Sequence, residues 1–138
     1  MHRNLSAEEM IALCEPSPEQ TAEGSKRIYD LFGKEVHPDW LNYGVHEGWY
    51  NVTTVNVNSI PSFVVWFHLD AQGGLIINAC ASICQKPQFS SMIAAVDKIA
   101  KNHLAKYIAF NTTRAGLARQ VVKFGYKAHS VTFEKFLV

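Results

Sequence analysis

The sequence predicts an α/β fold in which helices cover both faces of a mixed sheet. Three observations predict it. The first is that the spacing of apolar residues changes to a period of two near residue 52. The second is a glycine-rich turn that joins two apolar segments. The third is a helical segment that separates the later of these two segments from another short apolar segment. Strands joined by a tight turn are antiparallel, whereas a helical crossover leads to a parallel strand. We therefore expect an antiparallel meander that runs into a parallel βαβ unit.

Two helices are predicted at the start of the chain. Ser6 to Glu9 has the spacing of a capping box, and the helix that it opens should end before Pro16. Ser17 to Gln20 repeats this spacing with a proline at the first helical position. The second helix should turn Ile28 inward and end at Gly33.

The middle of the chain predicts an antiparallel sheet. Residues 34–50 are rich in aromatic residues and glycine, and we interpret them as a long connection of the kind that often carries function. Strands are predicted over residues 52–58, 63–70 and 75–83, and the last two are joined by a turn over residues 70–74. The third strand is mostly apolar, which favours a central position covered on both faces.

The last third alternates helices and strands. A helix should begin at Ser90, because apolar residues and one histidine then follow at helical spacing: Met92, Val96, Ile99 and His103. A short parallel strand is predicted over residues 107–110, and a further helix over residues 113–124 should end at Gly125. Residues 128–138 alternate and predict a final strand.

Length and composition favour one domain over residues 1–138. The chain is 48% hydrophobic and 18% charged, so it carries enough apolar surface for a core. Its longest apolar runs, residues 63–67 and 75–83, are much shorter than the roughly 20 residues that a membrane helix requires. No apolar leader follows Met1, and we expect a cytoplasmic protein that has no membrane contact.

Charge is divided unevenly along the chain. Residues 1–84 carry four basic and ten acidic side chains, whereas residues 85–138 carry nine basic and two acidic ones. The basic half predicts either a contact with phosphate groups or a solvated lysine-rich helix face. A nucleic-acid interface is the weakest interpretation, because the sequence lacks a recognition-helix, OB-fold or RNA-binding signature.

The cysteines do not predict a metal site. Cys80 and Cys84 lie four residues apart, but no second Cys or His pair with zinc-like spacing follows them. On a strand the two side chains would share one face as small core residues. We therefore expect no metal.

The segment from Leu75 to Val138 resembles the GNAT superfamily of acyl-CoA-dependent N-acyltransferases. The core of that family is a strand, a phosphate loop, a helix, a strand, and a helix that ends in Lys-x-Gly-aromatic. The corresponding parts here are residues 75–83, 84–89, 90–103 and 106–110, and the motif Lys123-Phe124-Gly125-Tyr126. The resemblance implies transfer of an acetyl group from acetyl-CoA to an amine of a small molecule or a protein.

The resemblance also implies a binding site for acetyl-CoA or CoA. In the family, the backbone at the end of the fourth strand binds the pantetheine arm, and the following loop and helix N-terminus hold the pyrophosphate. A helix N-terminus favours an anion in any protein. The positions that match here are Ser82, Ile83, Cys84, Gln85, Gln88, Phe89 and Ser90. Asn111 ends the next strand, where it would either contact the cofactor or cap the following helix.

Two family features are missing. Neither alignment frame of the phosphate loop keeps a glycine, and Pro87 removes an amide donor. The tyrosine that often protonates the departing thiolate is replaced by Val121. The candidates for a catalytic base are His68 and Glu47. The alternative interpretation is that His68 is an ordinary strand histidine and that Glu47 is a solvated loop carboxylate.

These departures leave an alternative function open. A GNAT fold that has lost catalysis could act as a binding or structural component, as in some phage-encoded and virion proteins. This alternative predicts a homo-oligomer or a partner protein that contacts the aromatic segment from Trp40 to Tyr50.

Overall fold

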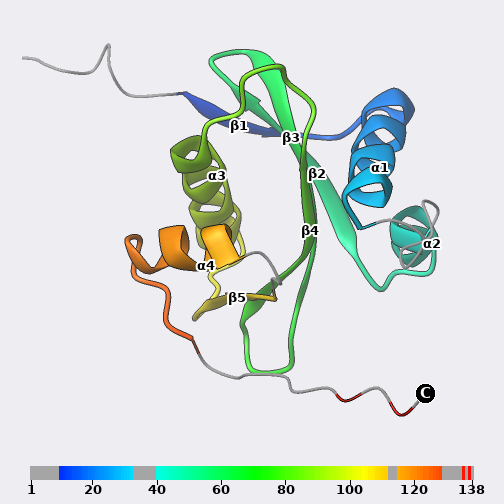
Figure 1. Cartoon of the computed structure of the whole chain (residues 1–138). Coiled ribbons are helices and arrows are strands. Elements are labelled where there is room, and N and C mark those ends of the chain that lie inside the picture. The colour runs from blue at the N-terminus through cyan, green and yellow to red at the C-terminus, as the bar shows by residue number, and fades with distance from the viewer. Residues whose placement is uncertain (1–9, 33–39, 112–114, 129–134, 136, 138) are drawn as a thin grey trace, which may run out of the picture.

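The computed structural model describes residues 10–32, 40–111, 115–128, 135 and 137 (Figure 1). Within these residues, nine elements follow one another: β1 (Ile11–Cys14), α1 (Pro18–Phe32), α2 (Trp40–His46), β2 (Asn51–Val57), β3 (Ile60–Leu69), β4 (Leu75–Ser82), α3 (Phe89–Asn102), β5 (Ile108–Phe110) and α4 (Ala115–Val122). The strands form one sheet in the order β1-β2-β3-β4-β5. The first four are antiparallel and β5 is parallel to β4, which confirms the predicted meander and βαβ unit.

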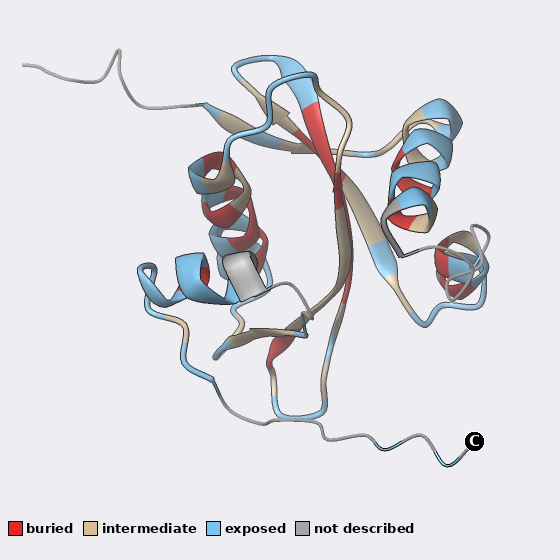
Figure 2. Cartoon of the chain, viewed as in Figure 1, coloured by how far each residue is buried: buried red, intermediate tan, exposed pale blue. Residues whose placement is uncertain are grey.

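Helices cover both faces of this sheet, as predicted. Helices α1 and α2 lie on one side and α3 and α4 on the other (Figure 1). Each side has its own core, and the buried residues lie where helix and sheet face each other (Figure 2). Fully buried Leu75 and Ile99 belong to the α3 side, whereas fully buried Trp66 and buried Ile28 belong to the α1 side.

Helix α1 confirms the predicted capping box. The backbone amide of Ser17 donates to Oε1 of Gln20 at 2.9 Å, and the amide of Gln20 donates to Oγ of Ser17 at 3.2 Å. The hydroxyl of Thr54 on β2 donates to the same Gln20 oxygen at 3.1 Å, so the cap also fixes the start of α1 to the sheet. Gly24 faces Trp66, and a Cβ at this position would lie 2.9 Å from the indole.

The first predicted helix is wrong over the part that the structure describes. Residues Ile11–Cys14 form β1, an edge strand that pairs with β2, and the capping box at residues 6–9 lies outside the described residues. The strand is favoured because Ile11 and Leu13 pack on the α3-side core while Asn58 exchanges hydrogen bonds with Met10. Pairing with a distant strand therefore outweighs local helix signals.

The prediction of a long connection over residues 34–50 is also partly wrong. Trp40–His46 form the short helix α2, whereas residues 34–39 lie outside the described residues. Leu41 is buried in the α1-side core. Gly44 is required for this packing, because a Cβ there would overlap the ring of Tyr50.

The C-terminal elements are confirmed as far as they are described. Helix α3 buries Val96 and Ile99, but His103 follows the helix and is exposed, with its ring centroid 5.3 Å from that of Phe67. Gly125 follows α4 with a positive φ of 93°, as a C-terminal stop requires. Most of the predicted last strand, residues 128–138, lies outside the described residues.

Candidate functional site

Strand β4 has a backbone edge that β5 does not cover. Strand β5 pairs only with Leu75–Ile77, whereas β4 continues to Ser82 (Figure 1). Among the described residues, no strand pairs with positions 78–82 of β4 on that side. Such an edge presents backbone donors and acceptors to a ligand or to another chain.

The pairing with β3 determines which amides point to this edge. The amide of Ile83 donates to the carbonyl of Ser62 at 2.8 Å, and bonding in an antiparallel ladder alternates along the strand. Ala79 and Ala81 therefore bond toward β3, and the backbone groups of Cys80 and Ser82 point to the open edge. The Cys80 side chain packs on the α3-side core, and this burial raises the pKa of its thiol to about 12.

A β-bulge lies where the edge begins. In the pairing with β3, Trp66 is opposite Ala79 and Phe67 is opposite Ile77, so Asn78 is one extra residue on β4. The bulge reverses the side-chain alternation. Ile77 packs on the α3-side core, and Ala79 packs on the α1-side core.

The side chain of Asn78 contacts His68 on β3. Nδ1 of His68 lies 2.9 Å from Oδ1 of Asn78. An amide oxygen only accepts hydrogen bonds, so the contact is a hydrogen bond in the tautomer whose Nδ1 carries the proton; in that neutral tautomer Nε2 is the acceptor. The half-buried imidazole also lies beside Tyr50, with 6.3 Å between the ring centroids. The sequence predicted His68 as a candidate base and Tyr50 only as part of the aromatic segment, and it did not identify Asn78.

One groove follows the end of β4. It has a volume of about 590 Å³ and lies between the β2–β3 turn and the β4–α3 loop. Four of the residues predicted to bind cofactor line it: Ile83, Cys84, Gln85 and Gln88. Lys86 also lines it, so the groove carries a positive charge.

The remaining predicted positions in this region begin α3 or end β4. Ser82 is the last residue of β4, and Phe89 and Ser90 are the first two residues of α3. No side chain caps this helix at Gln88, and the first amides of a helix have no carbonyl partner within it. The structure thus brings the predicted residues 82–90 together at one end of β4.

Other candidates lie apart from this cluster. Asn111 is exposed directly after β5, and the residues that it would cap lie outside the described ranges. Glu47 is exposed after α2. Val121 is a buried residue of α4. Tyr126 packs against Phe110 with 5.5 Å between ring centroids, and its burial, followed by the charge of Asp97, raises the pKa of its phenol.

An exposed group of aromatic side chains lies on and after α2. Trp40, Tyr43 and Trp49, here called the aromatic surface, are each about half exposed. Trp49 contacts both others, with centroid distances of 5.9 Å to Trp40 and 5.4 Å to Tyr43. Tyr50 follows Trp49 directly in the sequence, and its ring lies beside that of His68.

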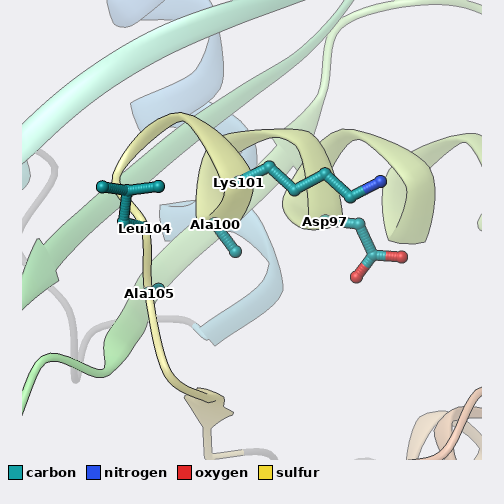
Figure 3. A pocket seen from close by; sticks show the side chains of 5 residues that line it. All are labelled: Asp97, Ala100, Lys101, Leu104 and Ala105. Atoms are coloured by element: carbon teal, nitrogen blue, oxygen red, sulfur yellow. The ribbon is translucent and has the colours of Figure 1, made fainter.

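A second hollow lies at the other end of α3. It has a volume of about 700 Å³ and is lined by Asp97, Ala100, Lys101, Leu104 and Ala105 (Figure 3). Leu104 is 88% exposed, which marks this hollow as an open surface. None of its residues was predicted to act in binding. It lies at the opposite end of α3 from the β4–α3 loop.

Two further features bear on the class of protein. No helix within the described ranges is long and apolar enough to cross a membrane. In that same part of the chain, no three His, Cys, Asp or Glu side chains come together as a metal site would require.

Comparisons with known proteins match the fold and not the sequence. No protein-family model and no curated protein matches the chain. Among solved structures, the aminoglycoside N-acetyltransferase AAC(6′)-Iy, in complex with a CoA-linked bisubstrate analogue, superposes with a TM-score of 0.59 at 12% identity, over 94% of this chain and 99% of that one. A GNAT family acetyltransferase from Staphylococcus aureus superposes with a TM-score of 0.54 at 14% identity, over 94% of this chain and 98% of that one. A ribosomal-protein-alanine N-acetyltransferase from Brucella melitensis superposes with a TM-score of 0.55 at 11% identity, over 95% of this chain and 98% of that one.

Proposed function

Because the chain has the fold of the GNAT acetyltransferases, we propose that it transfers the acetyl group of acetyl-CoA to an amine. The observation that carries the proposal is the open edge of β4. Its pairing with β5 stops at Ile77, and the backbone groups of Cys80 and Ser82 point outward beyond that position. A slender arm with amide groups, such as pantetheine, matches these donors and acceptors.

The other predicted positions would receive the phosphate end of the cofactor. The first amides of α3, at Phe89 and Ser90, favour an anion, and the Lys86 side chain adds a positive charge. Gln85 and Gln88 add side-chain donors in the groove. The missing glycines and Pro87 leave fewer backbone donors there, so the residues fit the arm better than the pyrophosphate.

The reaction needs a base and little other chemistry. A cationic amine first loses one proton to solvent, which frees the nitrogen lone pair. The nitrogen then forms a bond to the thioester carbonyl carbon, the carbon–sulfur bond breaks, and the nitrogen loses a second proton. His68 would accept that proton at Nε2, because its Nδ1 is already bound to Asn78. The departing thiolate would take its proton from solvent, since Val121 has no proton to give. Positioning of the two substrates would supply most of the rate acceleration over the uncatalysed reaction.

The aromatic surface would bind the amine acceptor. A protonated amine is attracted to the faces of Trp and Tyr rings, and three such rings are exposed here, with the exposed residue Glu47 between Tyr43 and Trp49 in the sequence. Tyr50 follows Trp49 in the sequence and its ring lies beside His68, so the acceptor would bind with its reacting nitrogen toward the proposed base. The proposed acceptor is therefore a cationic amine of a small molecule or a protein.

The test removes one backbone amide from the open edge. Acetyl-CoA at 100 times its Kd should stabilise the wild-type protein by about 2.7 kcal/mol, which raises Tm by several degrees. Ser82→Pro deletes an outward amide but no bond to β3, and proline is tolerated at a strand edge. We expect it to weaken acetyl-CoA binding about 2- to 12-fold, which corresponds to the loss of one hydrogen bond of ordinary strength. Ser82→Ala, which keeps the amide, should bind normally.

An unchanged wild-type Tm at saturating acetyl-CoA would contradict the proposal. Equal binding by Ser82→Pro and Ser82→Ala would show that the ligand lies elsewhere. Circular dichroism of both variants checks that the fold is retained. Release of free thiol from acetyl-CoA in the presence of a panel of amines then measures transfer.

A second candidate function is a non-catalytic binding or structural component. The observation that favours it is the aromatic surface, whose three rings are each about half exposed, together with the glycine-free loop. In that case the aromatic surface contacts a second copy or a partner protein. A protein that stays monomeric in light scattering and releases thiol from acetyl-CoA would exclude this candidate.

A further inference from the structure

We infer that Asn78 is a positioning residue, which holds the imidazole of His68 with Nε2 free to accept a proton. The inference rests on the proposed function and deepens it, because it assigns a role to a side chain that neither the family resemblance nor the sequence motifs identify. It is carried by the contact of 2.9 Å between Nδ1 of His68 and Oδ1 of Asn78.

The bulge determines where this amide lies. In a regular β3–β4 ladder Asn78 would be opposite Trp66, but here Ala79 takes that position and Asn78 is left as the extra residue. His68 is opposite Ile76, two residues before Asn78 and on the same face of β4. The extra residue therefore reaches diagonally to the imidazole.

The location of Asn78 joins this contact to the proposed substrate site. Ile77 is the last residue of β4 that pairs with β5, so Asn78 is the first residue of the open edge. Its backbone begins the stretch that would bind the arm, and its side chain fixes the ring of the base. Asparagine is disfavoured in strands, so a packing role alone gives little reason for it here.

The contact has a defined chemical consequence. With Nδ1 donating to Oδ1, the lone pair of the neutral ring is on Nε2. When Nε2 takes the proton from the attacking amine, the ring becomes cationic and its bond to Asn78 becomes a charge-assisted one. The amide thus selects the tautomer before the step and stabilises the imidazolium after it.

The test compares two substitutions of nearly equal size. Asn78→Asp keeps an acceptor for Nδ1–H, whereas Asn78→Leu removes it. Long-range ¹H–¹⁵N NMR distinguishes protonated from unprotonated ring nitrogens, so it reports the tautomer of His68 without any turnover. We expect Nδ1–H in the wild type and in Asn78→Asp, and loss of that preference in Asn78→Leu.

Kinetics then connect the tautomer to transfer. Loss of a general base costs about 10²-fold or more in kcat, which we expect for His68→Gln. Asn78→Leu should lower kcat by at least about tenfold and leave the Kd of acetyl-CoA unchanged. When Asn78→Leu is added to His68→Gln, kcat should fall little further than in His68→Gln alone. Circular dichroism and the acetyl-CoA thermal shift confirm that each variant is folded.

The two proposals fail in different measurements. A wild-type protein that neither binds nor consumes acetyl-CoA overturns the proposed function, and the role of Asn78 with it. If the wild type is active, the inference alone is overturned by either of two results. One is Nδ1–H retained in Asn78→Leu, and the other is a kcat of Asn78→Leu equal to that of the wild type.

Discussion

The hydroxyl of Tyr107 donates a hydrogen bond to the carboxylate of Asp70, and this bond ties the start of β5 to the turn between β3 and β4. Two backbone bonds reinforce the tie. The amide of Leu75 donates to the carbonyl of Tyr107 at 2.8 Å, and that of Lys106 donates to the carbonyl of Gly73 at 2.9 Å. The two parallel strands are therefore held together at one end, while at the other end β4 continues beyond its pairing with β5, which stops at Ile77.

This tie predicts how stability depends on pH. The bond from Tyr107 is the main cause that lowers the pKa of Asp70, so ionised Asp70 stabilises the fold above its unfolded pKa of about 3.9. That stabilisation is lost as the pH falls through the lower folded value. The same bond raises the pKa of Tyr107, so its contribution is complete below about pH 10 and is lost as the pH rises through the higher folded value.

Tyr107→Phe should therefore flatten both ends of the pH–stability curve. The measurement is Tm in steps of pH across the acidic and alkaline ranges, for the variant and the wild type. If the pH–stability curves of Tyr107→Phe and the wild type ran parallel, the bond between Tyr107 and Asp70 would be ruled out as the source of the pH dependence. Asp70→Asn is the matched variant for the acidic limb, because it removes the titrating carboxylate itself.

A second prediction concerns Gly74, which lies against the same tyrosine. A Cβ at this position would overlap the phenol ring of Tyr107, so Gly74→Ala forces the ring or the turn to move. We expect a loss of about 1 kcal/mol of unfolding free energy, the low end of the usual cost of overpacking, because the exposed ring of Tyr107 can move aside. The measurement is urea-induced unfolding.

Rescue by a second substitution distinguishes a clash from a backbone effect. Tyr107→Ala removes the ring that the new methyl group would meet. Gly74→Ala should therefore cost less in the Tyr107→Ala background than in the wild type. Equal costs in the two backgrounds would assign the loss to the turn backbone instead.

The relation of sequence to fold differs between local and distant features. The capping box of Ser17 and Gln20 and the apolar stripe of α3 could be predicted because their partners lie within one or two helical turns. Strand β1 could not, because only four residues form it and its favourable contacts are with β2, about 40 residues later. Local patterns therefore indicated a helix where distant pairing forms a strand.

The candidate site shows the same division. The cluster from Ser82 to Ser90 was predictable because it is one continuous segment. The contact of His68 with Asn78 depends on a bulge, and a bulge is a mismatch between two strands that neither strand shows alone. The one signal in the sequence was an amide side chain, Asn78, within the largely apolar run 75–83. An amide at such a position is equally compatible with a strand face that is open to solvent.

The last prediction tests the aromatic surface as the acceptor site. Cation–π contacts contribute about 0.5–2 kcal/mol, so Trp49→Ala, which removes the central ring, should raise KM for a cationic amine about 2- to 30-fold. The Kd of acetyl-CoA should not change, because Trp49 is not among the residues that line the groove at the end of β4. Leu69→Ala is a suitable control, since Leu69 is similarly exposed at the end of β3. Initial rates at varied amine concentration measure the effect. An equal rise in KM for a neutral amine would show that the rings act by apolar contact, whereas an unchanged KM for both would place the acceptor elsewhere and leave the aromatic surface to a protein partner.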